Sequence, residues 1–178
     1  MKIIGITGSS DSGKTTLAKK ISSPKKPVWD ADKAAHRALE NKNILKKLEQ
    51  IFSGIKNKNQ IELRQELAEK IFSKPALRKK LEKILHPHIR RDAEKFIRKQ
   101  RQKRIIKNII LDIPLLFEAG YQKICHHIIH VETPIRTRKK RLEQRGFSKQ
   151  RIAAADQRMW RNSKRKKHAA KKSTKNIK

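Results

Sequence analysis

Four short apolar runs lie along the chain, separated by longer stretches in which apolar residues recur at helical spacing. Short runs rich in Ile and Val, bounded by turn residues, are typical of strands in a buried parallel sheet. We expect the first two strands to be parallel neighbours joined by a helical crossover. The expected strands are residues 3–6, 28–29, 105–112 and 127–132. The pattern predicts an α/β fold.

The region 33–104, between the second and third expected strands, is helical throughout. Its apolar residues recur at three- and four-residue spacing, as in Leu63, Leu67 and Ile71. Pro75 stands where a helix can begin, and Pro87 is expected to separate that helix from the next one. The region is too long for an ordinary crossover. We therefore predict an inserted helical lobe.

A glycine-rich turn follows the first expected strand and precedes a helix-compatible segment. It reads Gly8-Ser-Ser-Asp-Ser-Gly13-Lys14-Thr15, which has the G-x-x-x-x-G-K-[ST] spacing of a phosphate-binding loop, or P-loop. The glycines permit backbone angles that direct successive N–H groups into a concave loop. Lys14 can reach the β- and γ-phosphates, and the Thr15 hydroxyl can bind Mg²⁺. The alternative is a plain Gly/Ser turn, but Lys and Thr in register favour a nucleoside triphosphate site.

Acidic residues end the second and third expected strands, at the sheet edge where open α/β folds bind ligands. Asp30 and Asp32 follow the run 28–29, and Asp112 closes the run 105–112. Asp32 is the candidate to orient an acceptor hydroxyl and accept its proton, although an Asp here also fits a helix N-cap. Asp112 resembles the acidic residue that closes a Walker-B strand and holds Mg²⁺.

Three arginines at helical spacing follow the fourth expected strand. They are Arg138, Arg141 and Arg145, and guanidinium groups at this place can close over ATP and neutralise the transferring phosphoryl group. Because the chain is so basic, the alternative is that these arginines are solvated surface residues without a catalytic role. The histidines at 126, 127 and 130 favour a structural role over a metal site, since no carboxylate or cysteine stands at ligand spacing.

The composition is strongly basic. There are 48 Lys and Arg against 16 Asp and Glu, a formal net charge of +32, which predicts non-specific affinity for polyanions. Aromatic residues make up only 4% of the chain and do not interleave with the basic ones, so nucleic-acid binding is not the main function predicted. Cys125 is the single cysteine, which excludes an intramolecular disulfide. No run approaches the roughly 18 apolar residues of a membrane span. We expect a cytoplasmic protein, and the oligomeric state is left open.

Together these segments resemble the dephospho-CoA kinase family, whose members phosphorylate the 3′-hydroxyl of the ribose in dephospho-CoA with ATP. The resemblance covers residues 1 to about 160, in order and approximate spacing. The loop alone identifies only a P-loop, whereas the Asp-Ala-Asp, Leu-His-Pro and Pro-Leu-Leu-Phe-Glu elements together are specific to this family. The matching segments are 6–16, Val28-Trp-Asp-Ala-Asp-Lys33, Arg64 with Ile71-Phe72, Leu85-His-Pro-His-Ile89, Asp112-Ile-Pro-Leu-Leu-Phe-Glu118, Arg141-Leu-Glu-Gln-Arg145 and Arg151-Ile152.

The resemblance implies a three-layer P-loop kinase fold in one domain, 1–178, with ATP, Mg²⁺ and dephospho-CoA as its small-molecule ligands. Its implied parts are a core (1–32 and 105–135), a helical acceptor-binding lobe (33–104), a lid (136–160) and a basic tail (161–178). The implied triphosphate-binding residues are Asp11, Ser12, Gly13, Lys14, Thr15 and Thr16, with Thr15 and Asp112 for the metal. The implied acceptor-binding residues are Asp32, Arg64, His86, Pro114 and Leu115, and the implied catalytic residues are Asp32, Lys14, Arg141 and Arg145.

Two segments depart from the family pattern. Ser9-Ser10-Asp11 stands where the family prefers glycine and an apolar residue, and the charge of Asp11 close to the phosphates opposes ATP binding. The segment 164–178 is basic and almost without apolar residues, where the family continues with a strand and a final helix. A nucleoside or nucleotide kinase of the same fold and a degenerate P-loop protein that binds nucleic acid are the alternatives to the dephospho-CoA kinase hypothesis.

Overall fold

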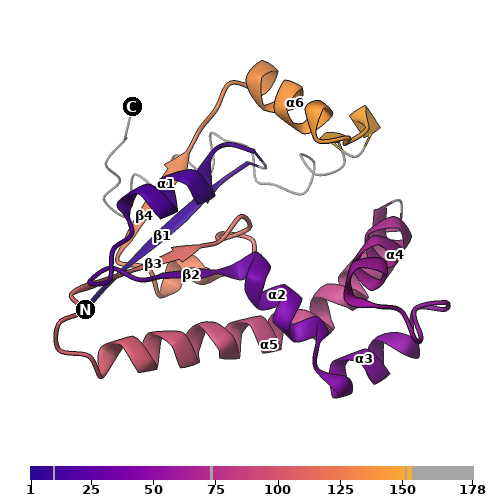
Figure 1. Cartoon of the computed structure of the whole chain (residues 1–178), viewed down its shortest axis with the longest axis horizontal. Coiled ribbons are helices and arrows are strands. Elements are labelled where there is room, and N and C mark those ends of the chain that lie inside the picture. The colour runs from indigo at the N-terminus through magenta and orange to yellow at the C-terminus, as the bar shows by residue number, and fades with distance from the viewer. Residues whose placement is uncertain (10, 73, 151, 154–178) are drawn as a thin grey trace. The chain divides into compact units, whose positions relative to one another are not determined.

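The computed structural model describes residues 1–9, 11–72, 74–150, 152 and 153. Its contacts divide the chain into two compact units (Figure 1). The sheet unit comprises Met1–Ala31 and the described residues from Phe96 onward, and the helical unit comprises Asp32–Lys95. Arg151, the end of the predicted lid (154–160) and the predicted basic tail (161–178) lie outside the described residues.

The sheet unit contains, in the described part of the chain, a four-stranded parallel sheet with the order β2-β3-β1-β4. The strands are β1 (Lys2–Gly8), β2 (Val28–Asp30), β3 (Asn108–Asp112) and β4 (His127–Val131). The prediction of an α/β fold with a parallel sheet is confirmed. The third strand begins at Asn108 and not at Ile105, whose side chain is 60% exposed.

The expectation that the second strand lies next to the first is wrong. β3 lies between them, since Ile110 pairs with Ile4 of β1 on one side and with Val28 of β2 on the other. The side chains of residues 109–111 are fully buried, which suits a strand covered on both faces and paired along both edges. The three-residue β2 has half-buried ends at Val28 and Asp30, which suits the edge of the sheet.

The two faces of the sheet are covered by different segments of the sheet unit. Helix α1 (Lys14–Ile21) packs its Ala18 against Ile6 on one face. On the other face a Cβ at Gly5 would lie 2.5 Å from Leu116 Cδ1 and 2.8 Å from Cys125 Sγ. The segment between β3 and β4, which includes the short helix η1 (Tyr121–Lys123), therefore packs closely against β1. Helix α6 (Ile135–Gln144) follows β4.

The helical unit has an apolar core of its own, with Phe52, Leu63 and Leu67 at most 3% exposed. Local signals set its helix starts; for example, Asn41 Oδ1 accepts hydrogen bonds from the N–H groups of Asn43 and Ile44 at 2.9 and 3.3 Å. Its helices are α2 (Ala31–Leu39), α3 (Lys42–Glu49), α4 (Gln60–Phe72) and the first part of α5 (Pro75–Arg101). Among the described residues, no helix is both long enough and apolar enough to cross a membrane.

The expectation that Pro87 separates two helices is also wrong, because α5 continues through it over 27 residues. A proline inside a helix lacks a hydrogen-bond donor and costs about 3 kcal/mol. Buried apolar side chains lie on both sides of it, with Leu85 before it and Ala93 after it. Packing over that length offsets the local cost, while Pro87 itself is exposed.

Candidate active site

The turn between β1 and α1 is held in shape by close backbone contacts. The Ser12 N–H donates to the Ser9 carbonyl at 3.1 Å, and Gly13, with φ +87°, caps the start of α1. A Cβ at Gly8 would collide with the Val131 carbonyl and lie 2.7 Å from Ser12 Oγ, so only glycine fits there. This geometry leaves a tight loop at the N-terminal end of a helix, which is a favourable place for an anion.

A second anchor joins this loop to the segment that follows β4, the edge strand next to β1. Thr133, two residues beyond β4, donates its hydroxyl to the Ser12 carbonyl at 2.9 Å. Sequence reasoning missed Thr133, because its partner is 121 residues away and no local pattern marks the contact. The loop is therefore fixed to the segment that leads into α6.

Lys14 is buried although it carries a charge. Its side chain is 7% exposed, and Nζ donates to the Ser9 carbonyl at 2.7 Å across the loop. Withdrawing an ammonium group from water is unfavourable unless acceptors or an anion compensate. The position of Lys14 in the first turn of α1 therefore concentrates positive charge at the loop, where a phosphate chain would supply negative charge.

Thr15 and Asp112, the two residues predicted for a metal, are in direct contact. Thr15 Oγ1 donates to Asp112 Oδ2 at 3.0 Å, and Asp112 is 4% exposed at the end of β3. Hydroxyl and carboxylate oxygens are hard ligands of the kind that Mg²⁺ prefers. Within the described residues there is no group of three or more His, Cys, Asp or Glu side chains suited to a metal ion. A Mg²⁺ ion held here would take its other ligands from phosphates and water.

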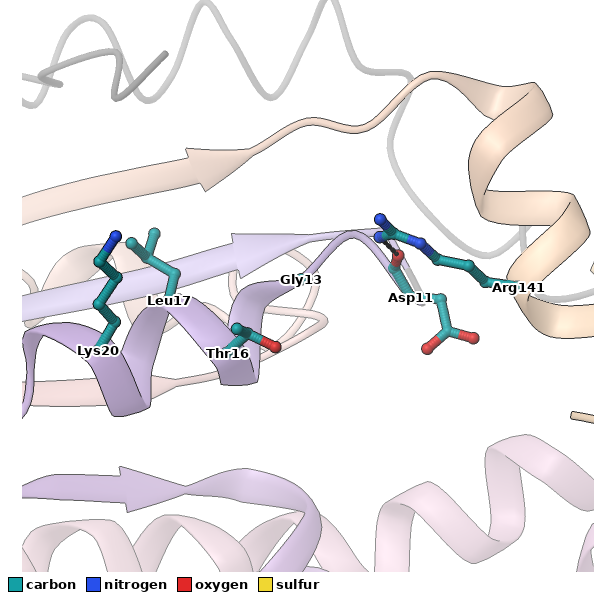
Figure 2. A pocket seen from close by; sticks show the side chains of 6 residues that line it. All are labelled: Asp11, Gly13, Thr16, Leu17, Lys20 and Arg141. Atoms are coloured by element: carbon teal, nitrogen blue, oxygen red, sulfur yellow. Dashed lines mark hydrogen bonds between the residues drawn. The ribbon is translucent and has the colours of Figure 1, made fainter.

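Two of the predicted arginines reach the loop from α6 and contact the same residue. Arg145 Nη1 lies 2.6 Å from Asp11 Oδ1. Arg141 Nη1 donates to the Asp11 carbonyl at 3.4 Å (Figure 2). Asp11 has φ +54°, a backbone conformation that Asp tolerates better than most residues. Arg138 differs from the other two arginines, since it is only 4% exposed. The sequence placed the arginines near the phosphates but gave no sign of their contact with Asp11.

A pocket of about 570 Å³ opens beside the first turns of α1 (Figure 2). Its lining includes a carboxylate, a hydroxyl, an ammonium and a guanidinium group beside the apolar side chain of Leu17. The lining residues are Asp11, Gly13, Thr16, Leu17, Lys20 and Arg141. Three of the predicted triphosphate-binding residues, Asp11, Gly13 and Thr16, therefore border one cavity.

Two of the residues predicted for the acceptor belong to the sheet unit. Pro114 and Leu115 are half-buried directly after β3, and the Pro114 carbonyl accepts a hydrogen bond from Thr7 Oγ1 at 3.0 Å. The contact fixes this turn at the same edge of the sheet as the loop. Contact of Pro114 and Leu115 with an acceptor stays a prediction.

The other predicted acceptor residues belong to the helical unit. Asp32 is exposed and lies within the first turn of α2, which begins at Ala31, so Asp32 is not its N-cap. Arg64 is half-buried, with its Nε donating to the Gln60 carbonyl at 2.9 Å, and His86 is exposed on α5. A common acceptor site for these residues stays a prediction.

The histidines near β4 were expected to be structural, and one has a clear structural contact. His126 Nδ1 accepts a hydrogen bond from the Ile3 N–H at 3.1 Å, at the edge where β4 meets β1. The His126 ring therefore adds one hydrogen bond to the pairing of β1 and β4, with the Ile3 N–H as its donor.

Comparison with known proteins places this chain in a family. A sequence model of the dephospho-CoA kinase family matches residues 2–176. Two curated relatives named dephospho-CoA kinase are from Zymomonas mobilis, 33% identical over 171 residues (95% of this chain and 85% of the relative), and from Gluconobacter oxydans, 38% identical over 158 residues (88% and 77%).

Solved structures agree with these relatives. A crystal structure of a Thermus thermophilus protein is 32% identical and superposes with a TM-score of 0.77, covering 94% of this chain and 85% of that one. A dephospho-CoA kinase from Campylobacter jejuni is 30% identical, with a TM-score of 0.64 and a coverage of 99% and 88%. The chain belongs to the dephospho-CoA kinase family.

Proposed function

We propose that this protein transfers the γ-phosphoryl group of ATP to the 3′-hydroxyl of the ribose of dephospho-CoA, giving CoA and ADP. The observation that carries the proposal is the match of the family to residues 2–176 of a chain whose phosphate loop holds a buried lysine. The reaction is the last step of coenzyme A synthesis, and we place it in the cytoplasm. Cys125 is buried and is the single cysteine of the sequence, which suits a reducing compartment.

The phosphate loop would bind the triphosphate. Backbone N–H groups of the loop, the positive end of α1 and the Lys14 ammonium would act on the same anion, because Lys14 stands in the first turn of α1 and its Nζ reaches back to the Ser9 carbonyl. Lys14 would contact the β- and γ-phosphates and stabilise the negative charge on them. Ser12 is held by hydrogen bonds to Ser9 and Thr133, so this part of the loop would need little reorganisation when ATP binds.

Thr15 and Asp112 would hold Mg²⁺ together with phosphate oxygens and water. Their contact at 3.0 Å shows two oxygen groups at one edge of the sheet, next to the loop, as such an ion requires. The chemistry that the ion supplies in kinases is neutralisation of charge on the β- and γ-phosphate oxygens.

Asp32 would act as the base for the acceptor. It accepts the proton of the 3′-hydroxyl while the oxygen forms its bond to the γ-phosphorus and the bond between the γ-phosphorus and the bridging oxygen of ADP breaks. Arg141 and Arg145 would stabilise the charge on the transferring group, and Arg64, His86, Pro114 and Leu115 would bind the acceptor. The exposure of Asp32 leaves its carboxylate accessible to a substrate.

The test is an assay of ADP and CoA formation with Mg·ATP and dephospho-CoA. We expect Asp32→Asn to lower kcat by about 10²- to 10⁴-fold while the KM for ATP changes little. The matched control is Glu40→Gln, which neutralises an exposed carboxylate just beyond the same helix. No turnover above that of Asp32→Asn in the wild-type protein would refute the proposal. Faster transfer to nucleosides or nucleotides, assayed side by side, would favour the other kinase hypothesis.

The affinity for polyanions that the net charge of +32 predicts is a separate property. It would appear as nucleic-acid binding that weakens steeply with salt. It replaces the kinase proposal only if phosphorylation of the acceptor is absent as well.

A further inference from the structure

Asp11 brings a carboxylate into a loop whose other features favour anionic ligands. Its side chain is 16% exposed, and Oδ1 forms an ion pair with Arg145 Nη1 at 2.6 Å. Its other oxygen, Oδ2, is buried and has no hydrogen-bond partner among the residues that the structure describes. A carboxylate with so little water around it is stabilised by a cation that faces it, which here is Arg145.

The same arginines are the groups that a triphosphate in the loop would need. Arg145 pairs with the carboxylate of Asp11, and Arg141 donates to its carbonyl at 3.4 Å, so both guanidinium groups contact the loop at Asp11. Arg141 and Asp11 also line the 570 Å³ pocket together (Figure 2). A phosphate chain in the loop and the carboxylate of Asp11 would therefore attract the same guanidinium group.

We propose that Asp11 acts as an internal substitute for phosphate. In the protein without nucleotide its carboxylate holds Arg145, and its carbonyl holds Arg141, against the loop. Binding of a nucleoside triphosphate exchanges this ion pair for contacts between the phosphates and the same guanidinium groups. Asp11 is thus a positioning residue that lowers triphosphate affinity and sets where α6 rests. The inference builds on the proposed use of ATP.

The exposure of the pair limits the size of the effect. The Arg145 side chain is 65% exposed, so water and salt screen its attraction to Asp11. Exposed ion pairs contribute little, and we expect a change in ATP affinity of about 3- to 10-fold. The change should be larger at low salt, where screening is weaker.

The first experiment removes the charge and keeps the backbone. Asn and Gly both tolerate the φ of +54° at this position, so Asp11→Asn and Asp11→Gly should retain the loop. Dissociation constants for ATP and for adenosine are measured by titration calorimetry. We expect both variants to bind ATP about 3- to 10-fold more tightly than the wild-type protein, while adenosine affinity stays the same. Glu143→Gln, an exposed acid on α6, is the control for the same change in net charge.

The second experiment asks whether Arg145 carries the effect. In an Arg145→Gln background, the tightening caused by Asp11→Asn should disappear, because the group over which the two anions compete is absent. Tightening of the same size in both backgrounds would mean direct repulsion between Asp11 and phosphate, and would overturn the proposal. Unchanged or weaker ATP binding in both Asp11 variants would overturn it too.

Failure of this inference and failure of the proposed function give different results. The titrations contain no acceptor. If the protein binds ATP but does not phosphorylate dephospho-CoA, the proposed function is refuted, while the titrations still test the role of Asp11. If neither the wild-type protein nor the Asp11 variants bind ATP, the inference is overturned as well.

Discussion

Polar and charged side chains are buried in the sheet unit, whereas all the buried side chains described in the helical unit are apolar. The buried polar residues of the sheet unit are Thr7, Ser12, Lys14, Gln100, Asp112 and Arg138. Burying such groups costs stability unless each one is satisfied, and it is tolerated where their chemistry is needed. The helical unit shows the ordinary alternative, a core stabilised by apolar burial alone.

The difference separates two kinds of substitution. A change in the core of the helical unit should lower the free energy of unfolding and leave the affinity of the folded protein for ATP alone. A change at a buried polar group of the sheet unit should lower the affinity for ATP or the activity, and leave the free energy of unfolding nearly unchanged. Two variants test this contrast, and a third tests a charged residue outside the core of the helical unit; they are taken from the largest expected effect to the smallest.

The largest expected effect follows from Phe52→Ala. Phe52 is 2% exposed in the core of the helical unit, and truncating a buried Phe costs about 3–5 kcal/mol, because apolar burial is lost and a cavity is left. Urea denaturation measures the loss, and calorimetry at low temperature measures the ATP affinity of the protein that stays folded. Phe147→Ala, at a side chain 39% exposed in the sheet unit, is the control. A loss below about 1 kcal/mol would show that the site repacks.

Lys14→Met should give the opposite result. Met keeps most of the aliphatic stem and removes the charge, so kcat/KM should fall by about 10²- to 10³-fold while the melting temperature changes little. The comparison variant is Lys19→Met, at an exposed lysine on the same helix, which should retain activity. Steady-state kinetics and thermal unfolding are measured on the same samples. Unfolding of Lys14→Met at room temperature would contradict the contrast between the two units.

The smallest expected effect concerns acid stability. Lys70 Nζ and Lys58 Nζ lie 2.9 and 3.3 Å from the Glu66 carboxylate, and their hydrogen bonds, that of Lys70 first, lower the pKa of Glu66 below its ordinary value of 4.5. The ionised form is favoured in the folded state, so the stabilisation is present above pH 4.5 and is lost as the pH falls below it. The melting temperatures of the wild-type protein and Glu66→Gln should converge over that range. A constant difference down to pH 3 would refute this assignment.

The sequence was sufficient for those parts of the fold that depend on local pattern. The P-loop motif located the turn that contains Lys14, and apolar runs located the strands, because both signals lie within a few neighbouring residues. Asp112 was found at the end of β3, because an apolar run that closes on an acidic residue is a local signal. Those features need no knowledge of distant contacts.

Other features could not be predicted because they depend on distant contacts. In the sheet, β3 and not β2 lies beside β1. A run of apolar residues predicts a strand but does not indicate which other strand pairs with it. Pro87 was expected to end a helix, but the packing of α5 offsets its local effect. The ion pair of Asp11 with Arg145 joins residues 134 positions apart, so no spacing rule could indicate it.

The anchor at Thr133 has a mechanical consequence. Its hydroxyl is attached to the loop carbonyl of Ser12, and α6 begins two residues later at Ile135. A ten-residue helix is about 15 Å long, and the start of α6 is held next to the phosphate loop. If a bound nucleotide tilted α6 by about 20° at that point, the far end, next to Arg145, would move by about 5 Å. A small adjustment at the loop would thus become a larger displacement at Arg145.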